Sequence, residues 1–322
     1  MLLRHLLPAL LAATLTSLAA AAEDPQDFSK VEIKSSQLAP NLFVLEGSGG
    51  NIAALTGADG VLLVDDEFGA LADKIRAALR ADGATQPVRF IINTHYHFDH
   101  TDGNLAFAQG GATLIAHDSL RTRLASGGTA GNGGKISLAI KPAEAGALPV
   151  ITYQSELTVH LNGETVRVHH YANAHTDGDS IVFFPGTRAV HMGDIFVRYG
   201  FPFIDVSGGG NVRGMIGACQ DVIASVPPDT RIIPGHGAVA TVEDLREYTK
   251  MLTDTAALIE QAIARGEDLA AIKKANPLRP WSARYSPAKG FVDTEAFTES
   301  LFSSLSGRLP RHGPAPRPRP RS

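Results

Sequence analysis

The chain has 322 residues and a formal net charge of −4 at pH 7, a balance that gives no reason to expect a nucleic-acid partner. Its hydrophobic content of 44% is ordinary for a globular protein, and its length suits one large domain or two small ones. The single cysteine, Cys219, excludes an intramolecular disulfide. Because Cys219 lies in a stretch with helical apolar spacing, we expect a buried core thiol.

The N-terminus is typical of a secretory signal peptide covering residues 1–22. Arg4 and His5 form a short basic start, residues 6–18 are apolar, and three alanines at 20–22 offer a cleavage site before Glu23. The apolar run is too short to span a membrane. We therefore expect a periplasmic or secreted protein with no membrane span in its mature form.

The first half of the chain is predicted to consist of short strands around one helix. Apolar runs predict strands over residues 41–45, 51–55, 61–64, 88–92 and 113–116. Helical spacing predicts a helix over residues 70–79, and Asp118 can cap a short helix after the last strand. Residues 125–149 are rich in glycine and alanine without a period, so we expect a long loop that could act as a lid.

The second half repeats the order of strands followed by helices. A hairpin is predicted around Asn162-Gly163. Further strands are expected over residues 181–184, 189–190 and 231–233, and helices over 212–223 and 242–263. The repeated order predicts two α/β halves whose sheets face each other, with helices outside. We expect one domain over residues 23–306, with a C-terminal helical segment from about 265 that packs on an outer face.

The C-terminal tail, residues 307–322, is rich in proline and arginine. Such a composition predicts an extended or disordered segment outside the core.

Four metal-competent side chains, His95, His97, Asp99 and His100, lie within six positions directly after the strand predicted at 88–92. Imidazole nitrogen and carboxylate oxygen are the ligands that zinc takes when cysteine is absent. On extended backbone, residues two apart point the same way. His95 and His97 could therefore reach one ion, while Asp99 and His100 could turn toward a second.

Three later residues, His175, Asp194 and His236, lie near the ends of predicted strands and beside glycines that allow close backbone packing. Together with the first motif, they form the order His-x-His-x-Asp-His, then His, Asp, and a last His in Pro-Gly-His-Gly. This pattern resembles the metallo-β-lactamase superfamily over roughly residues 40–265. The resemblance implies an α/β fold, a four-layer αββα sandwich with a site at one edge.

The resemblance also implies a ligand set for two zinc ions. One ion would be held by His95, His97 and His175, and the second by Asp99, His100 and His236, with Asp194 bridging both. Iron or manganese could replace zinc, because His/Asp ligands suit several metals. Thr94, Tyr96 and Thr176 are candidates for orienting these ligands.

The implied activity is hydrolysis of an ester, thioester, lactone or lactam carbonyl of a small molecule by a metal-bridged hydroxide. Asp99 would orient the nucleophile or shuttle a proton. The aspartate at 194 resembles that of glyoxalase II and lactonase relatives rather than the cysteine-type lactamases. A periplasmic metallo-β-lactamase and a non-catalytic metal-binding protein are the alternatives, and the oligomeric state is left open.

Two features bear on substrate binding. Asn211 follows three glycines in a run that resembles the glycine-asparagine step where cysteine-type lactamases carry a substrate-binding asparagine, but its place before residue 212 also suits a helix cap. Residues 198–204, which follow Asp194 closely and include several aromatics, could line the mouth of the site.

Overall fold

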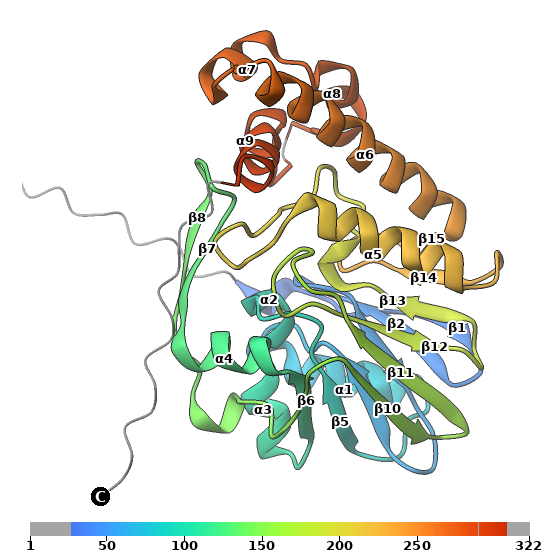
Figure 1. Ribbon diagram of the computed structural model, residues 1–322. Coiled ribbons are helices and arrows are strands. Elements are labelled where there is room, and N and C mark those ends of the chain that lie inside the picture. Colours follow the sequence, from blue (N-terminus) through green and yellow to red (C-terminus); the bar gives the residue numbers. More distant parts are fainter. Residues whose placement is uncertain (1–26, 289, 308–322) are drawn as a thin grey trace, which may run out of the picture.

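The computed structural model describes residues 27–288 and 290–307. The predicted signal peptide and residues 308–322 of the predicted tail lie outside these residues. The described chain forms a four-layer sandwich, with two facing sheets between outer layers of helices (Figure 1). This is the αββα architecture that the sequence predicts.

The first sheet has seven strands in the order β1-β2-β3-β4-β5-β6-β9. Their bounds are Lys34–Ala39, Leu42–Glu46, Ile52–Leu55, Val61–Val64, Val88–Ile92, Thr113–His117 and Ile151–Tyr153. Strands β4, β5, β6 and β9 run parallel. Their carboxyl ends therefore lie at one edge, which is where α/β sheets place ligand sites.

The second sheet has six strands in the order β10-β11-β12-β13-β14-β15. Their bounds are Glu156–Leu161, Glu164–His170, Ser180–Phe184, Ala189–His191, Arg231–Ile233 and Ala240–Thr241. The predicted hairpin is present, since β10 pairs with β11 in antiparallel register and Leu161 lies opposite Glu164. Strands β13 and β14 run parallel, so both lead toward the same edge of this sheet.

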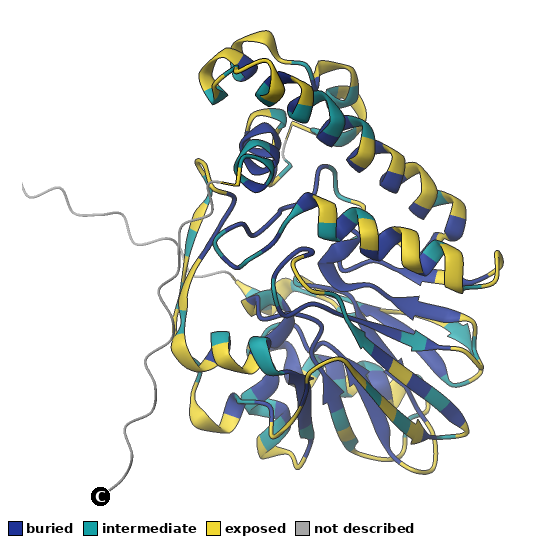
Figure 2. Ribbon diagram, in the orientation of Figure 1, coloured by how far each residue is buried: buried dark blue, intermediate teal, exposed yellow. Residues whose placement is uncertain are grey.

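Three large apolar cores and a fourth, smaller cluster around Leu120 and Leu124 hold the layers of the described chain together. The core between the sheets joins side chains such as Val44 and Leu62 from the first sheet to Val168 and Val182 from the second. The other two cores bury the outer sheet faces under helices, and Figure 2 shows the strands dark blue where both faces are covered. Strands buried on both faces explain why the sequence shows continuous apolar runs rather than alternation.

Helices form where the sequence predicts them, the C-terminal segment included, and the two short helices over residues 98–101 and 104–109 are additional. The described helices are α1 (Ala72–Ala81), α2 (Phe98–Thr101), α3 (Asn104–Gln109), α4 (Asp118–Ser126), α5 (Val212–Ser225), α6 (Val242–Ala264), α7 (Leu269–Ala275), α8 (Arg279–Tyr285) and α9 (Thr294–Leu305). The cap of α4 is His117, whose Nδ1 accepts from the Ser119 amide, rather than Asp118. Among the described helices, none is at once long and apolar enough to cross a membrane.

The prediction of a free loop over residues 125–149 is wrong. Part of this segment forms a hairpin of β7 (Gly128–Gly131) and β8 (Ser137–Ile140), which rises beside α9 in Figure 1. Asn132 donates to the Ala296 carbonyl at 2.9 Å, and the Glu299 carboxylate accepts from the Lys135 amide at 2.8 Å. The hairpin is therefore held by α9, and the alternate residues Ile136, Leu138 and Ile140 pack against the neighbouring core.

Cys219 is fully buried on α5, as the sequence predicts. Burial raises the pKa of its thiol to about 12, so almost none of the reactive thiolate exists at pH 8. We expect Ellman's reagent to react with the native protein on the order of 10³-fold more slowly than with an unfolded chain. One thiol should react after unfolding in guanidinium; rapid stoichiometric reaction without denaturant would contradict a buried Cys219.

Candidate metal centre

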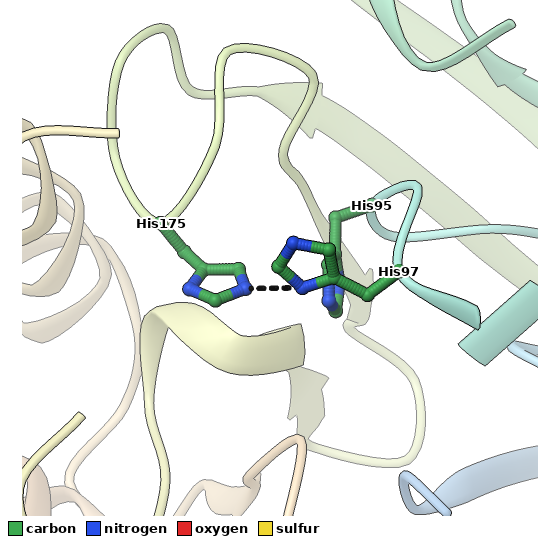
Figure 3. A group of neighbouring side chains, drawn as sticks. All are labelled: His95, His97 and His175. Atoms are coloured by element: carbon green, nitrogen blue, oxygen red, sulfur yellow. Dashed lines mark hydrogen bonds between the residues drawn. The ribbon is translucent and has the colours of Figure 1, made fainter. Parts of the chain in front are cut away.

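Three imidazoles meet at the edge where the two sheets come together. His95 and His97 extend from the loop after β5, and His175 comes from the loop between β11 and β12. His175 Nε2 lies 3.0 Å from His97 Nδ1, and the three rings face a common point in Figure 3. Their ring centroids are 4.7–4.8 Å apart. This spacing places three nitrogen donors around one small volume.

A second group lies beside the first. It consists of Asp99 and His100 in the first turn of α2 and His236 in the loop after β14. His236 Nε2 is 3.2 Å from an Asp99 carboxylate oxygen and 3.2 Å from His100 Nε2. Within this group, one donor atom from each residue lies within 4.8 Å of the others.

Asp194 connects the two groups. It lies in the single turn that follows β13. One carboxylate oxygen is 3.3 Å from His100 Nε2 and 3.5 Å from His236 Nε2, while the other is 3.9 Å from His175 Nε2. The seven side chains thus fall into the two sets that the resemblance implies, with Asp194 between them.

Among the candidate ligands, four buried imidazoles each have a hydrogen-bond partner at the ring nitrogen that points away from the other ligands. His175 Nδ1 lies 2.7 Å from the Phe203 carbonyl, and His95 Nδ1 lies 3.0 Å from the Thr94 hydroxyl. The remaining partners are Asp205, at 3.0 Å from His97 Nε2, and Asp65, at 2.8 Å from His100 Nδ1. Such partners fix the ring orientation and leave the second nitrogen free to bind a metal.

The orienting residues are only partly those expected. Thr94 contacts His95, and the Tyr96 hydroxyl donates to the Asp205 carboxylate behind His97. Thr176, by contrast, donates to Asp179 at 2.6 Å. The sequence analysis missed Asp65 and Asp205, both fully buried.

The donor set fits a divalent metal. His95 Nε2 is buried and has no hydrogen-bond partner, and a buried polar atom without a partner is costly unless something binds it. Burial, together with the neighbouring His100 and His175, lowers the pKa of His95. Burial and His97 lower the pKa of His175 to about 4. Both rings are therefore neutral near pH 7, which is the form that binds a metal.

The second group has the opposite electrostatics. Burial opposes a charged ring at His236, but the Asp194 carboxylate outweighs it and raises the His236 pKa to about 10. Burial likewise opposes ionisation of Asp99, but His100 and His236 lower the Asp99 pKa to about 2. In this arrangement protons balance the acids, and a metal ion bound here would have to displace them.

Close backbone packing around the centre requires glycine at two positions. A Cβ atom on Gly50 would lie 2.1 Å from the His100 ring, and one on Gly235 would lie 2.0 Å from an Asp194 carboxylate oxygen. The segments of the two glycines are joined by a 2.7 Å hydrogen bond from the Asn51 amide, next to Gly50, to the Gly235 carbonyl. The two sheets therefore meet directly behind the candidate ligands.

Asn211 occupies the N-cap of α5. Its side-chain oxygen accepts from the Arg213 amide at 2.8 Å, and its Nδ2 donates to the Ser304 carbonyl at 2.8 Å. Both polar atoms thus contact backbone, as the cap alternative requires, while the proposed substrate contact of Asn211 stays a prediction.

The segment after Asp194 lies partly at the centre and partly in the core. Phe201 and Ile204 are fully buried. The Tyr199 ring lies 5.6 Å from the His236 ring, and the Phe203 ring lies 5.8 Å from the His97 ring. Only part of the predicted mouth segment therefore borders the cluster.

Comparison with known proteins supports one family. The family model described as "Metallo-beta-lactamase superfamily" matches residues 45–248, more than half of the chain. The chain belongs to the metallo-β-lactamase superfamily. Members of this superfamily generally bind divalent metals, in agreement with the His/Asp groups described above.

Two curated relatives are similar to this chain over 205 and 224 residues. A hydroxyacylglutathione hydrolase of Polaromonas sp. strain JS666 is 29% identical over 205 residues, which cover 63% of this chain and 62% of the relative. A 2,4-dinitroanisole O-demethylase subunit alpha of Nocardioides sp. strain JS1661 is 25% identical, covering 67% of this chain and 61% of the relative. The matches thus span about three fifths of each relative.

Solved structures agree in fold. A metallo-β-lactamase from Pontibacter korlensis aligns with a TM-score of 0.56 at 13% identity, covering 69% of this chain and 99% of that one. The DIM-1 metallo-β-lactamase aligns with a TM-score of 0.53 at 19% identity, covering 70% and 100% of the two chains. At these identities the likeness establishes the shared sandwich.

Proposed function

We propose that this superfamily member is an exported, zinc-dependent hydrolase that attacks an ester, thioester, lactone or lactam carbonyl of a small molecule. The observation that carries the proposal is the convergence of seven His and Asp side chains in two joined groups. Four of the imidazoles are also fixed by a hydrogen-bond partner at their other ring nitrogen. The name of the Polaromonas relative supports hydrolysis. Export is supported by the signal-like sequence of residues 1–22.

The seven side chains would hold two ions in the sets implied by the resemblance. Bound zinc would supply the chemistry of a water whose pKa is lowered to about 7 and of a polarised carbonyl. Asp99 is the candidate catalytic residue of the chain itself, because its side chain is 23% exposed and ionised. It can accept a proton from the attacking water and donate it to the leaving group.

Metal removal tests this function. We expect the purified protein to hydrolyse an acyl thioester or a homoserine lactone, to lose this activity after dialysis against a chelator, and to regain it with zinc. Manganese and iron(II) should be added in parallel, because His/Asp ligands accept both. A protein dialysed without chelator is the control. Hydrolysis that survives complete removal of metal would overturn the proposal.

The same experiment separates the alternatives. A chromogenic cephalosporin added to the substrate panel tests the lactamase, and turnover of it above the thioester and lactone would favour that function. A stoichiometry of two bound zinc ions per chain with no turnover of any substrate would instead indicate a metal-binding protein without catalysis.

A further inference from the structure

An exposed aromatic ring lies next to the candidate metal centre. In the described part of the chain the large hydrophobic side chains that are exposed are Phe98, Val150, Ile151 and Phe291, and Phe291 is 54% exposed. The Phe291 ring centroid lies 5.6 Å from that of Phe203. The Phe203 ring in turn lies 5.8 Å from the His97 ring and 6.0 Å from the His175 ring. One buried ring therefore separates Phe291 from the candidate ligands.

This position of Phe291 differs from the expected packing on an outer face. It lies in the connection between α8 and α9, and both ends of that connection are fixed. The Phe201 amide donates to the Tyr285 carbonyl at 2.6 Å. At the other end Val292 is 1% exposed, and Asp293 caps α9 by accepting from the Ala296 amide. Single exposed apolar side chains are common on protein surfaces, so what points to a binding role is the contact of Phe291 with Phe203 beside the candidate ligands.

Two cations pair with acids that lie close in sequence to Phe291 and His175. Lys135 pairs with Asp293, two residues from Phe291, at 2.6 Å. Arg123 pairs with Asp177, two residues from His175, through two contacts of 2.5 and 2.6 Å. Both cations are therefore already paired with acids of the chain, so neither is left as an unpaired partner for a substrate carboxylate.

We propose that the ring pair Phe203–Phe291, here called the phenyl wall, binds an apolar group next to the scissile carbonyl. The natural substrates would then be esters or thioesters with an alkyl or aryl group on the acyl side or on the leaving-group side. This inference rests on the proposed function and adds the substrate class. Phe291 lies outside residues 45–248 that match the family model, so the phenyl wall uses the C-terminal segment of this chain.

Two substrate series test the phenyl wall and distinguish the two sides. One series lengthens the acyl chain of 4-nitrophenyl esters from acetate to octanoate, and the other lengthens the thiol of acetyl thioesters. With the zinc-loaded full chain, we expect kcat/KM to rise along one series by up to roughly fourfold per methylene. In Phe291→Ala this rise should flatten, so that the loss relative to wild type grows with each added methylene. Phe291→Leu should restore part of the rise.

The control and a binding measurement keep the outcomes separate. Ile151→Ala removes another exposed apolar side chain, on the edge strand β9, and should leave both series unchanged. Calorimetry should show that octanoate binds more tightly than acetate to wild type but not to Phe291→Ala. An unchanged rise in Phe291→Ala, or an equal loss at every chain length, would overturn the phenyl wall. Absence of hydrolysis by wild type would overturn the proposed function. The calorimetric comparison of octanoate with acetate would still test whether the phenyl wall binds apolar groups.

Discussion

Replacing Asp99 by asparagine is expected to lower kcat by about 10²–10⁴-fold while the fold stays intact. The amide keeps the size of the side chain but removes the charge that lies 3.2 Å from His236 Nε2, and it cannot accept a proton. Steady-state kinetics with a thioester, together with the metal content of the variant, measure the effect. A loss of kcat with metal still bound would place Asp99 in proton transfer, and a loss of one metal would place it in ligation.

The matched control for this change is Asp102→Asn, which makes the same substitution three residues later. Asp102 is exposed and its carboxylate accepts from the Gly69 amide, a bond that an amide oxygen can also accept. Its kinetics should stay within about threefold of wild type, since surface changes of this kind have small effects. Full activity in Asp99→Asn would remove Asp99 from the mechanism.

Gly235→Ala is expected to disrupt the second group of candidate ligands. The added Cβ would lie 2.0 Å from an Asp194 carboxylate oxygen and 2.6 Å from the carbonyl carbon of Gly193. Since backbone cannot yield as a side chain can, Asp194 and His236 should both shift. A displacement of about 1 Å costs on the order of 10²-fold in rate, and overpacking costs about 1–3 kcal/mol of stability. Metal stoichiometry, kcat and thermal unfolding measure these effects.

Gly217→Ala provides the comparison, because a Cβ there meets nothing within 4 Å on the exposed side of α5. Alanine is favoured over glycine within a helix by about 1 kcal/mol, so this variant should be fully active and slightly more stable. Normal zinc binding by Gly235→Ala would show that the backbone at Gly193 adapts more easily than the packing suggests.

The sandwich could be predicted from the sequence because its central strands are buried on both faces. Runs such as residues 52–55 and 61–64 are continuously apolar and buried, and glycines or polar residues mark where each run ends. Strands β1 and β9 were missed, since both lie at sheet edges and β1 is mostly exposed. An exposed edge strand carries little apolar pattern for a sequence analysis to detect.

The grouping of the seven candidate ligands was implied by the family resemblance, whereas the two acids that contact these ligands, Asp65 and Asp205, were not predicted. Asp65 directly follows β4, which is parallel to β5, so the rule that sites gather at strand ends could have found it. Asp205 lies in an irregular segment, and its link to His97 depends on how that segment packs. The β7–β8 hairpin was missed for a similar reason, because its partners lie on α9, more than 150 residues later.

Asp205 also joins the candidate metal centre to the end of the chain. Its other carboxylate oxygen accepts from the amide of Gly131, the last residue of β7, at 2.8 Å. The hairpin to which β7 belongs is in turn held by Ala296 and Glu299 of α9. A chain emerges N-terminus first, and early segments begin to fold before late ones appear. The chain of contacts that holds Asp205 against His97 is therefore completed only once residue 299 has been synthesised and packed. A nascent or truncated chain contains His95 and His97 early, but it lacks the contacts that fix Asp205 beside the His97 ring.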